Sequence, residues 1–237
     1  MKIDRIFIIN LESRNDRKLE TLAQLNRAKI TNYEFFKAIE PKSVEEINEW
    51  NPIFVTTKPD WLRSDFQKYR LGSFGCLQSH IGVIKMAMER NYENILVLED
   101  DVNIKLIPNP EKGESFEETY NFIKPQLEEL AKRQEIDIFY LGGTHHNNKL
   151  TKVTNNIWQT RQTGTTSSYI ITKSGMKKVL ANIDKCDKEI DCFYIDVMQK
   201  KHNCFCIAPT MMNQRPSYSD IVQTHVSYNL DKPKWFL

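Results

Sequence analysis

This 237-residue sequence has no large excess of positive or negative charge, no long apolar run and no regularly spaced cysteine pairs. Lysine and arginine number 33 against 31 aspartate and glutamate residues, which gives a formal net charge of +2. Nucleic-acid-binding proteins carry a markedly basic surface, so this near-neutral balance gives no reason to expect one. We therefore expect any affinity for anions to be confined to a local site.

No stretch of the sequence approaches the length of a membrane span. The apolar run of residues 6–9 is too short for the core of a signal peptide. The five cysteines are odd in number and include no C-x-x-C pair, unlike a secreted disulfide framework. We expect a cytoplasmic protein with buried thiols, and treat a zinc site around Cys204 and Cys206 as the weaker alternative. The basic, aromatic segment 232–237 either packs on the domain, which we favour, or touches a membrane surface.

Strand-like and helix-like patterns alternate along the chain, which predicts an α/β protein. With 40% hydrophobic residues, the chain can bury the core of one large domain. We expect a mostly parallel central sheet flanked by helices, with ligand sites at the carboxyl ends of its strands. The expected strands are residues 6–9, 33–36, 95–98, 136–141, 168–172 and 204–208. The expected helices run through residues 19–25, 77–88, 115–134, 174–183 and 190–201.

Three segments show no clear periodicity. Residues 40–72 contain scattered prolines and tryptophans, which indicates an ordered excursion over the site. Residues 108–115 carry prolines, a glycine and polar residues and are expected to form a surface loop, and Pro125 marks a kink or break in the helix that follows. Residues 209–237 mix polar, basic and aromatic residues and are expected to be irregular.

Three consecutive carboxylates, Glu99, Asp100 and Asp101, follow directly on the apolar strand 95–98. Their mutual repulsion raises their pKa values and costs stability, so they need open water or a cation. In an extended segment Glu99 and Asp101 lean to one face and Asp100 to the other, so the first two can share a divalent cation. Hard oxygen ligands favour Mn²⁺ or Mg²⁺. A solvated acidic turn is the alternative, but the position at the end of a buried strand favours a metal site.

The turn after the first strand reads NLESRNDR and brings Arg14 and Arg17 to the start of a helix. Free backbone N–H groups and the helix dipole favour an anion there, and two cations add to that field. Ordinary surface arginines paired with Glu12 and Asp16 are an equally good reading. His80 lies on an apolar helix face, and taken alone it indicates only a packed histidine.

Several motifs in one order carry a resemblance to a known family. They are INLESRNDR, GSFGCLQSH, ILVLEDDV, YLGG, GTTSSYIITKSGMKKVL, EIDCFYIDVMQKKH and a run from Gln214 to Ser219, Asp220 and Ile221. The set is similar to glycosyltransferase family 25, which includes bacterial lipooligosaccharide galactosyltransferases and collagen hydroxylysine galactosyltransferases. The resemblance spans nearly the whole chain.

The resemblance implies a Rossmann-like GT-A type fold in a single domain, 1–237, with a donor-binding half of about 1–105 and an acceptor-binding half of about 135–237. It implies an inverting transfer of a hexose, galactose ahead of glucose, from a UDP-sugar with Mn²⁺ or Mg²⁺. The implied acceptor is a saccharide, as in lipopolysaccharide biosynthesis, or a hydroxylysine-type peptide, as in collagen glycosylation.

The resemblance also assigns site residues by their place in these motifs. Glu99 and Asp101 become the metal ligands, with Asp101 the more direct one, and His225 is expected to complete the metal shell. The implied nucleotide-sugar contacts are Asn10, Leu11, Arg14, Arg17, Ser79, His80, Asp100 and Gly143. A glycine such as Gly143 also allows close backbone approach by a sugar.

An inverting transfer needs a base on the acceptor hydroxyl. We expect Asp191 in this role and Asp196 as the second candidate, while an Asp191 that only caps a helix is the alternative. Cys192 stands where collagen-type members have an acidic residue. The alternative that the protein is an inactive family member, which binds a saccharide or a partner, therefore stays open. A metal-dependent phosphohydrolase or nuclease would need further clustered acids and a basic groove.

Overall fold

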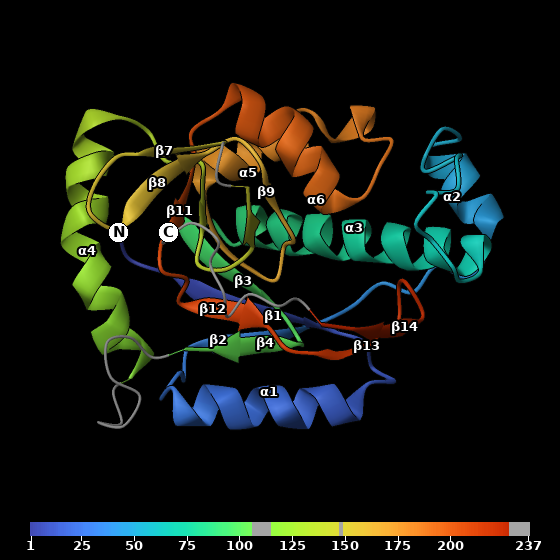
Figure 1. The fold of residues 1–237 in the computed structure, drawn as a ribbon, viewed down its shortest axis with the longest axis horizontal. Coiled ribbons are helices and arrows are strands. Elements are labelled where there is room, and N and C mark those ends of the chain that lie inside the picture. The colour runs from blue at the N-terminus through green and yellow to red at the C-terminus, as the bar shows by residue number, and fades with distance from the viewer. Residues whose placement is uncertain (106–114, 147–148, 228–237) are drawn as a thin grey trace.

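In the computed structural model, the described residues 1–105, 115–146 and 149–227 form an eight-stranded sheet with helices on both faces (Figure 1). The strands in sheet order are β2 (Tyr33–Lys37), β1 (Arg5–Asn10), β3 (Asn94–Glu99), β10 (Ser168–Thr172), β5 (Ile138–Tyr140), β11 (Cys204–Ile207), β8 (Ile157–Thr160) and β7 (Leu150–Lys152). The helices are α1 (Asn15–Arg27), α2 (Val44–Trp50), α3 (Phe66–Glu89), α4 (Phe116–Arg133), α5 (Lys173–Leu180), a 3-10 helix (Ile183–Lys185), α6 (Ile190–Phe193) and a π-helical turn (Tyr194–Gln199). The predicted α/β class is confirmed.

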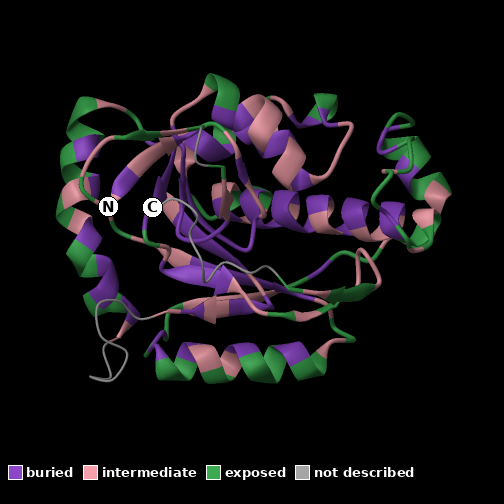
Figure 2. Ribbon diagram, in the orientation of Figure 1, coloured by how far each residue is buried: buried purple, intermediate pink, exposed green. Residues whose placement is uncertain are grey.

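The central strands are buried on both faces, as Figure 2 shows for the middle of the sheet. In β1, Phe7 and Ile9 belong to the core on the α3 side, whereas Ile6 and Ile8 belong to the core that includes α1 and α4. Alternate side chains of a strand point to opposite faces, so a strand covered on both sides reads as a continuous apolar run. The apolar runs of β1 and β3 are explained in this way.

The sheet is mixed, which corrects the expectation of a mostly parallel one. β1 pairs in parallel with β2 and β3, and β5 with β11, but the pairings β3–β10, β10–β5, β11–β8 and β8–β7 are antiparallel. A parallel return needs a long crossover, usually a helix. Between β5 and β10 the chain instead forms the short strands β6 (Thr144–His145), β7, β8 and β9 (Thr163–Gly164), so β10 returns antiparallel.

Helix α3 begins at Phe66, before the helix that the sequence predicted through residues 77–88, and its added first turns contain Gly72 and Gly75. Glycine weakens a helix by about 1 kcal/mol relative to alanine, so a stretch with two glycines does not read as helical in the sequence. Both glycines permit close packing here: a Cβ on Gly75 would lie 2.5 Å from the carbonyl oxygen of Ile39. Pro125 was predicted to mark a kink or a break; α4 runs through it as one helix, so a break there is wrong.

The expected irregular region beyond residue 209 contains ordered strands. β12 (Met212–Gln214) pairs with β4 (Val102–Ile104), and β13 (Ser217–Ser219) forms a hairpin with β14 (Thr224–Val226). We call this second pair the β13–β14 hairpin. None of the described helices is both long enough and apolar enough to cross a membrane. Of the predicted loop over residues 108–115, only Ser115, the N-cap residue of α4, is among the described residues; the rest of that loop and the segment 232–237 lie outside them.

Candidate active site

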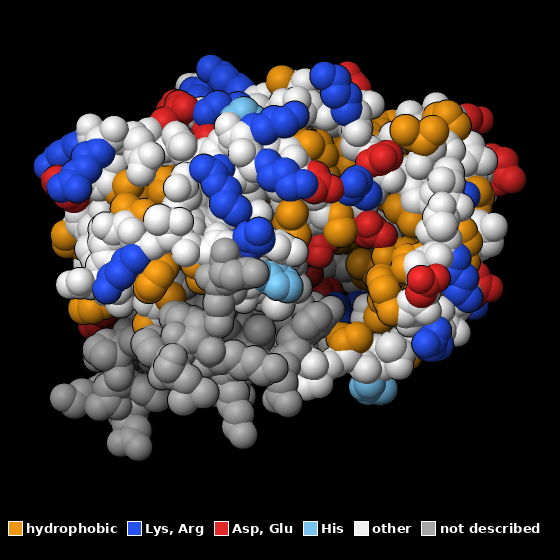
Figure 3. Space-filling view, turned by 45° about the horizontal axis from the view of Figure 1, so that its top comes forward, with side chains coloured by type: hydrophobic (Ala, Val, Ile, Leu, Met, Phe, Trp, Pro, Cys, Tyr) orange, Lys and Arg blue, Asp and Glu red, His pale blue; other side chains and the backbone are white. Residues whose placement is uncertain are grey.

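A cavity of about 270 Å³ lies at the carboxyl ends of β1 and β3. We call it the first cavity. In the space-filling view, a hollow on one face holds acidic side chains between hydrophobic ones (Figure 3). The lining comes from the turn after β1, from segment 38–41, from α3, from the end of β3 and from the β13–β14 hairpin. Residues predicted for the site that line it are Leu11, Arg17, Ser79, His80, Glu99, Asp100 and Asp101.

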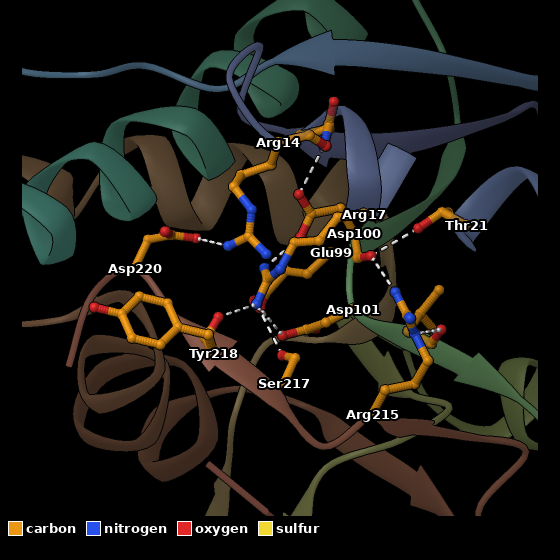
Figure 4. A network of polar contacts seen from close by, with 12 residues as sticks. Arg14, Arg17, Thr21, Glu99, Asp100, Asp101, Arg215, Ser217, Tyr218 and Asp220 are labelled. Carbon is orange, nitrogen blue, oxygen red and sulfur yellow. Dashed lines mark hydrogen bonds and ion pairs between the residues drawn. The ribbon is translucent and has the colours of Figure 1, made fainter. Parts of the chain in front are cut away.

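Asp100 is fully engaged by the protein itself, as Figure 4 shows in part. Its Oδ1 accepts a 2.6 Å hydrogen bond from Arg17 Nη1, and its Oδ2 accepts one of 2.8 Å from Asn10 Nδ2. The backbone carbonyl of Asp100 accepts from the Thr21 hydroxyl and from Arg215 Nη2. Asp100 therefore fixes the end of β1 and the start of α1 against the end of β3. Each of its two carboxylate oxygens already accepts a hydrogen bond from the protein.

Asp101 has one free oxygen. Its Oδ2 accepts a 2.8 Å hydrogen bond from Gln214 Nε2 and lies 3.4 Å from Arg17 Nη2. Its Oδ1 is buried and has no hydrogen-bond partner among the described residues. Burial, with the negative charge of Glu99, raises the pKa of Asp101 to about 7 although Arg17 opposes the shift. A buried carboxylate oxygen without a donor is a good ligand for a hard cation.

Glu99 is held in its ionised form. Its Oε1 accepts a 2.8 Å hydrogen bond from the Thr166 hydroxyl and lies 3.3 Å from His80 Nε2. Burial by itself raises the pKa of Glu99, but the neighbouring His80, the Thr166 hydroxyl and the charge of Arg17 outweigh it and lower that pKa. The His80 ring is positioned in turn by Tyr169, whose hydroxyl lies 2.9 Å from Nδ1.

Two sets of metal-ligating groups meet at Glu99. One is the oxygen pair of Glu99 and Asp101, and the other joins Glu99 to Cys76 and His80, whose ligand atoms all lie within 4.8 Å of one another. Only a thiolate ligates a metal well, and burial with nearby carboxylates raises the pKa of the Cys76 thiol well above its usual range. The carboxylate pair therefore fits Mn²⁺ or Mg²⁺ better than the thiol set fits a softer ion.

A second cavity, of about 390 Å³, adjoins the first. The two share the lining residues Cys76, Glu99, Gln214, Ser219 and Ile221. Asp191 lines the second cavity, and its carboxylate accepts from the backbone N–H groups of Cys192 at 2.8 Å and Thr165 at 3.4 Å. Burial raises the pKa of Asp191. Asp191 lies in the first turn of α6 and is not its N-cap, which is Glu189.

The structure does not bring the remaining predicted residues into these two cavities. Asp196 forms ion pairs with Lys188 and Lys200 on the outer side of the π-helical turn. His225 is exposed on β14, where its ring packs edge-on against Tyr218 at 5.7 Å. Gly143 adopts a φ of +145° beside Thr163 and lines neither cavity.

Several residues that were predicted to contact the nucleotide sugar instead bind other parts of the protein. Arg14 is the N-cap residue of α1, and its guanidinium pairs with Asp16 and with Asp220 of the β13–β14 hairpin. The Arg17 guanidinium binds Asp100, Ser217 Oγ and the carbonyl of Tyr218. Ser79 donates to the carbonyl of Gly75 and accepts from the backbone N–H of Ile39. These bonds hold the segments around the first cavity together.

Three residues that the sequence analysis placed in family motifs but gave no role in the site lie beside its carboxylates. Thr166 binds Glu99, Gln214 binds Asp101, and Thr165 lies between Thr166 and the Asp191 carboxylate. Thr165 has a φ of 64°, a conformation that is rare and costly for a β-branched residue. Ordinary threonine and glutamine side chains give no signal of their own in a sequence. The strained backbone is visible only in three dimensions.

Comparison with known proteins gives a family match over most of the chain. Residues 3–194 match the family model described as glycosyltransferase family 25 (LPS biosynthesis protein). Over 109 residues the chain is 32% identical to procollagen galactosyltransferase 2 of Mus musculus, which covers 44% of this chain and 17% of that protein. Over 154 residues it is 30% identical to procollagen galactosyltransferase 1-B of Xenopus laevis, covering 60% and 21%.

The chain thus matches about a fifth of the length of these curated relatives. Among solved structures, a glycosyltransferase involved in the glycosylation of the major capsid of PBCV-1 superposes with a TM-score of 0.46 and 11% identity. That superposition covers 92% of this chain and 95% of the other.

Proposed function

The chain belongs to glycosyltransferase family 25, and from this we propose that it transfers a hexose, galactose ahead of glucose, from a UDP-sugar to an acceptor hydroxyl with inversion. The observation that supports this most is the free, buried Oδ1 of Asp101 beside Glu99 at the end of β3. Glu99 and Asp101 are the residues that would hold Mn²⁺ or Mg²⁺. Bound there, the cation would stabilise the negative charge on the departing diphosphate.

The protein's own residues prepare this arrangement. The ion pair of Arg17 with Asp100 neutralises the middle carboxylate of the triplet, so that the carboxyl groups of Glu99 and Asp101 are left facing the first cavity. Thr166 and His80 keep Glu99 ionised, and Gln214 orients Asp101. His225 is not included in the proposed metal shell because it is exposed on β14, outside the lining of both cavities.

Asp191 is the proposed base. The acceptor oxygen forms a bond to the anomeric carbon as the bond from that carbon to the diphosphate breaks, and the hydroxyl proton passes to the Asp191 carboxylate. A pKa raised by burial makes Asp191 a stronger base than an ordinary aspartate. Its position in the second cavity, which meets the first at Glu99, supports attack from the side opposite the leaving group.

Transfer from a panel of UDP-sugars, measured with Mn²⁺ present and absent, tests this function. We expect Asp191→Asn to lower kcat by about 10²-fold or more with the donor KM unchanged, since it removes the base alone. Asp196→Asn is the matched control, because Asp196 pairs with lysines outside both cavities, and it should retain activity. No turnover of any UDP-sugar under any metal condition would contradict the proposal.

A further inference from the structure

The second cavity has one wall that the proposed function does not use. It is formed by Trp61 and Tyr69, which lie on the segment between α2 and α3 and at the start of α3. We propose that this cavity is the acceptor subsite for a pyranose ring without an anionic group, seated on Trp61 with a hydroxyl at Asp191. This inference rests on the proposed function, because it assigns the acceptor side of the same site.

Trp61 offers an aromatic surface at the mouth of the cavity. Trp61 is 59% exposed, although it lines the cavity. Its ring makes an edge contact with Tyr69, with ring centroids 5.6 Å apart and planes at 84°. A large aromatic side chain that is held in place but left exposed suits a flat apolar partner, and the C–H face of a sugar ring is such a partner.

Polar groups with fixed positions stand beside this surface. The Tyr69 hydroxyl donates to Glu189 Oε1 at 2.5 Å, and Glu189 is the N-cap residue of α6. Asp191 follows two residues later and lines the same cavity. An aromatic wall with a few preplaced polar groups is the usual composition of a ligand site, and carboxylates accept hydrogen bonds from sugar hydroxyls.

The charge of the cavity excludes an anionic ring. Its acidic lining residues are Glu99, Glu189 and Asp191, and no lysine, arginine or histidine lines it among the residues that the structure describes. With Glu99 assigned to the divalent cation, a carboxylate or phosphate on an acceptor ring at Trp61 would face Glu189 and Asp191 without a compensating lysine, arginine or histidine among the described lining residues, which costs binding energy. A neutral ring meets only hydrogen-bond acceptors.

Initial rates with methyl glycosides as acceptors test the subsite in the whole enzyme. Uncharged methyl β-galactoside and methyl β-glucoside are compared with methyl β-glucuronide and with a hydroxylysine peptide. We expect Trp61→Ala to raise the acceptor KM about tenfold while the donor KM stays within about twofold, with partial recovery in Trp61→Phe. Phe122→Ala is the control, because Phe122 is 57% exposed on α4 and lines neither cavity.

We also expect the uncharged glycosides to be preferred over the glucuronide, and Glu189→Gln to narrow that preference. An unchanged acceptor KM in Trp61→Ala, equal use of the glucuronide, or transfer to the peptide alone would overturn the subsite. These outcomes all require an enzyme that turns over a UDP-sugar. Failure of the proposed function is distinct, since no UDP-sugar would then be hydrolysed or transferred by the wild-type protein.

Discussion

Arg17 Nη1 lies 2.6 Å from Asp100 Oδ1, although 83 positions separate the two residues in the sequence. Both side chains are almost entirely buried, at 10% and 7% exposed. The pair therefore relieves part of the repulsion among three consecutive carboxylates, because one of them is neutralised by an arginine from the first turn of α1. Only Glu99 and Asp101 remain for a cation.

Asp100→Ala should destabilise the protein strongly. Removing Asp100 leaves the buried Arg17 guanidinium with only its longer, 3.4 Å contact to Asp101 as a counter-charge, and breaking a buried pair costs about 3–5 kcal/mol. Urea unfolding of the two proteins measures this loss.

The matched control is Asp16→Ala, since the Asp16 side chain is 61% exposed where it pairs with Arg14. Solvent screens an exposed pair, so this variant should unfold near the wild-type midpoint. Equal losses in both variants would mean that Asp100 is no more than a surface charge.

The sequence predicted the positions of β1, β3 and β10 because apolar runs covered on both faces are local and continuous. It predicted that the acidic triplet ends a strand, and it separated Asp100 from the other two by side-chain alternation. It could not show that Asp100 binds Arg17, because that contact depends on how β1 and β3 are paired.

The rest of the site depends on long-range topology. Thr166 reaches Glu99 only because β10 returns antiparallel beside β3, with Ser168 opposite Leu98. The sequence pattern favoured a parallel return, so the two residues were not expected to meet. The sequence offers no reason of its own to distinguish the environments of Asp191 and Asp196. The fold does so, because it places Asp191 in the second cavity and pairs Asp196 with two lysines.

Thr166→Val tests whether the Thr166 hydroxyl matters for the metal site. The change keeps the shape of the side chain and removes the 2.8 Å hydrogen bond to Glu99. Groups that orient a metal ligand typically change affinity or activity by about 10–100-fold, so Mn²⁺ affinity should fall by that order. Thr151→Val, at an exposed position on β7, should leave Mn²⁺ affinity as it is, and equal affinity in all three proteins would count against the role of Thr166.

Gly142→Ala should disturb the contact between β5 and the segment at β12. A Cβ at this position would lie 2.1 Å from the carbonyl oxygen of Met212 and 2.6 Å from Ser168 Oγ. Overpacking of this kind costs about 1–3 kcal/mol, measured as a lower unfolding midpoint. Gly164→Ala is the control, because nothing lies within 4 Å of its added Cβ, and the two variants should differ clearly.

His145 should limit stability in acid. Burial, followed by the neighbouring His146, lowers the pKa of His145 from 6.5 to about 4. Because the folded-state pKa is depressed, its contribution is complete above the unfolded pKa of 6.5 and is lost as the pH falls toward 4, by about 1.4 kcal/mol per pH unit at most. His145→Gln should make the unfolding temperature depend less on pH between pH 6.5 and 4. The same change at the exposed His225 should leave that dependence as it is in the wild-type protein. Parallel pH profiles for the two variants would exclude this role.

The central claim is that Asp101 and Glu99 hold a divalent cation for a nucleotide sugar, and calorimetric titration of UDP tests it most directly. Wild-type protein should bind UDP at least about tenfold more tightly with Mn²⁺ than without it, and Asp101→Asn should remove that difference. UDP affinity that is the same with and without Mn²⁺, and unchanged by Asp101→Asn, would contradict the claim.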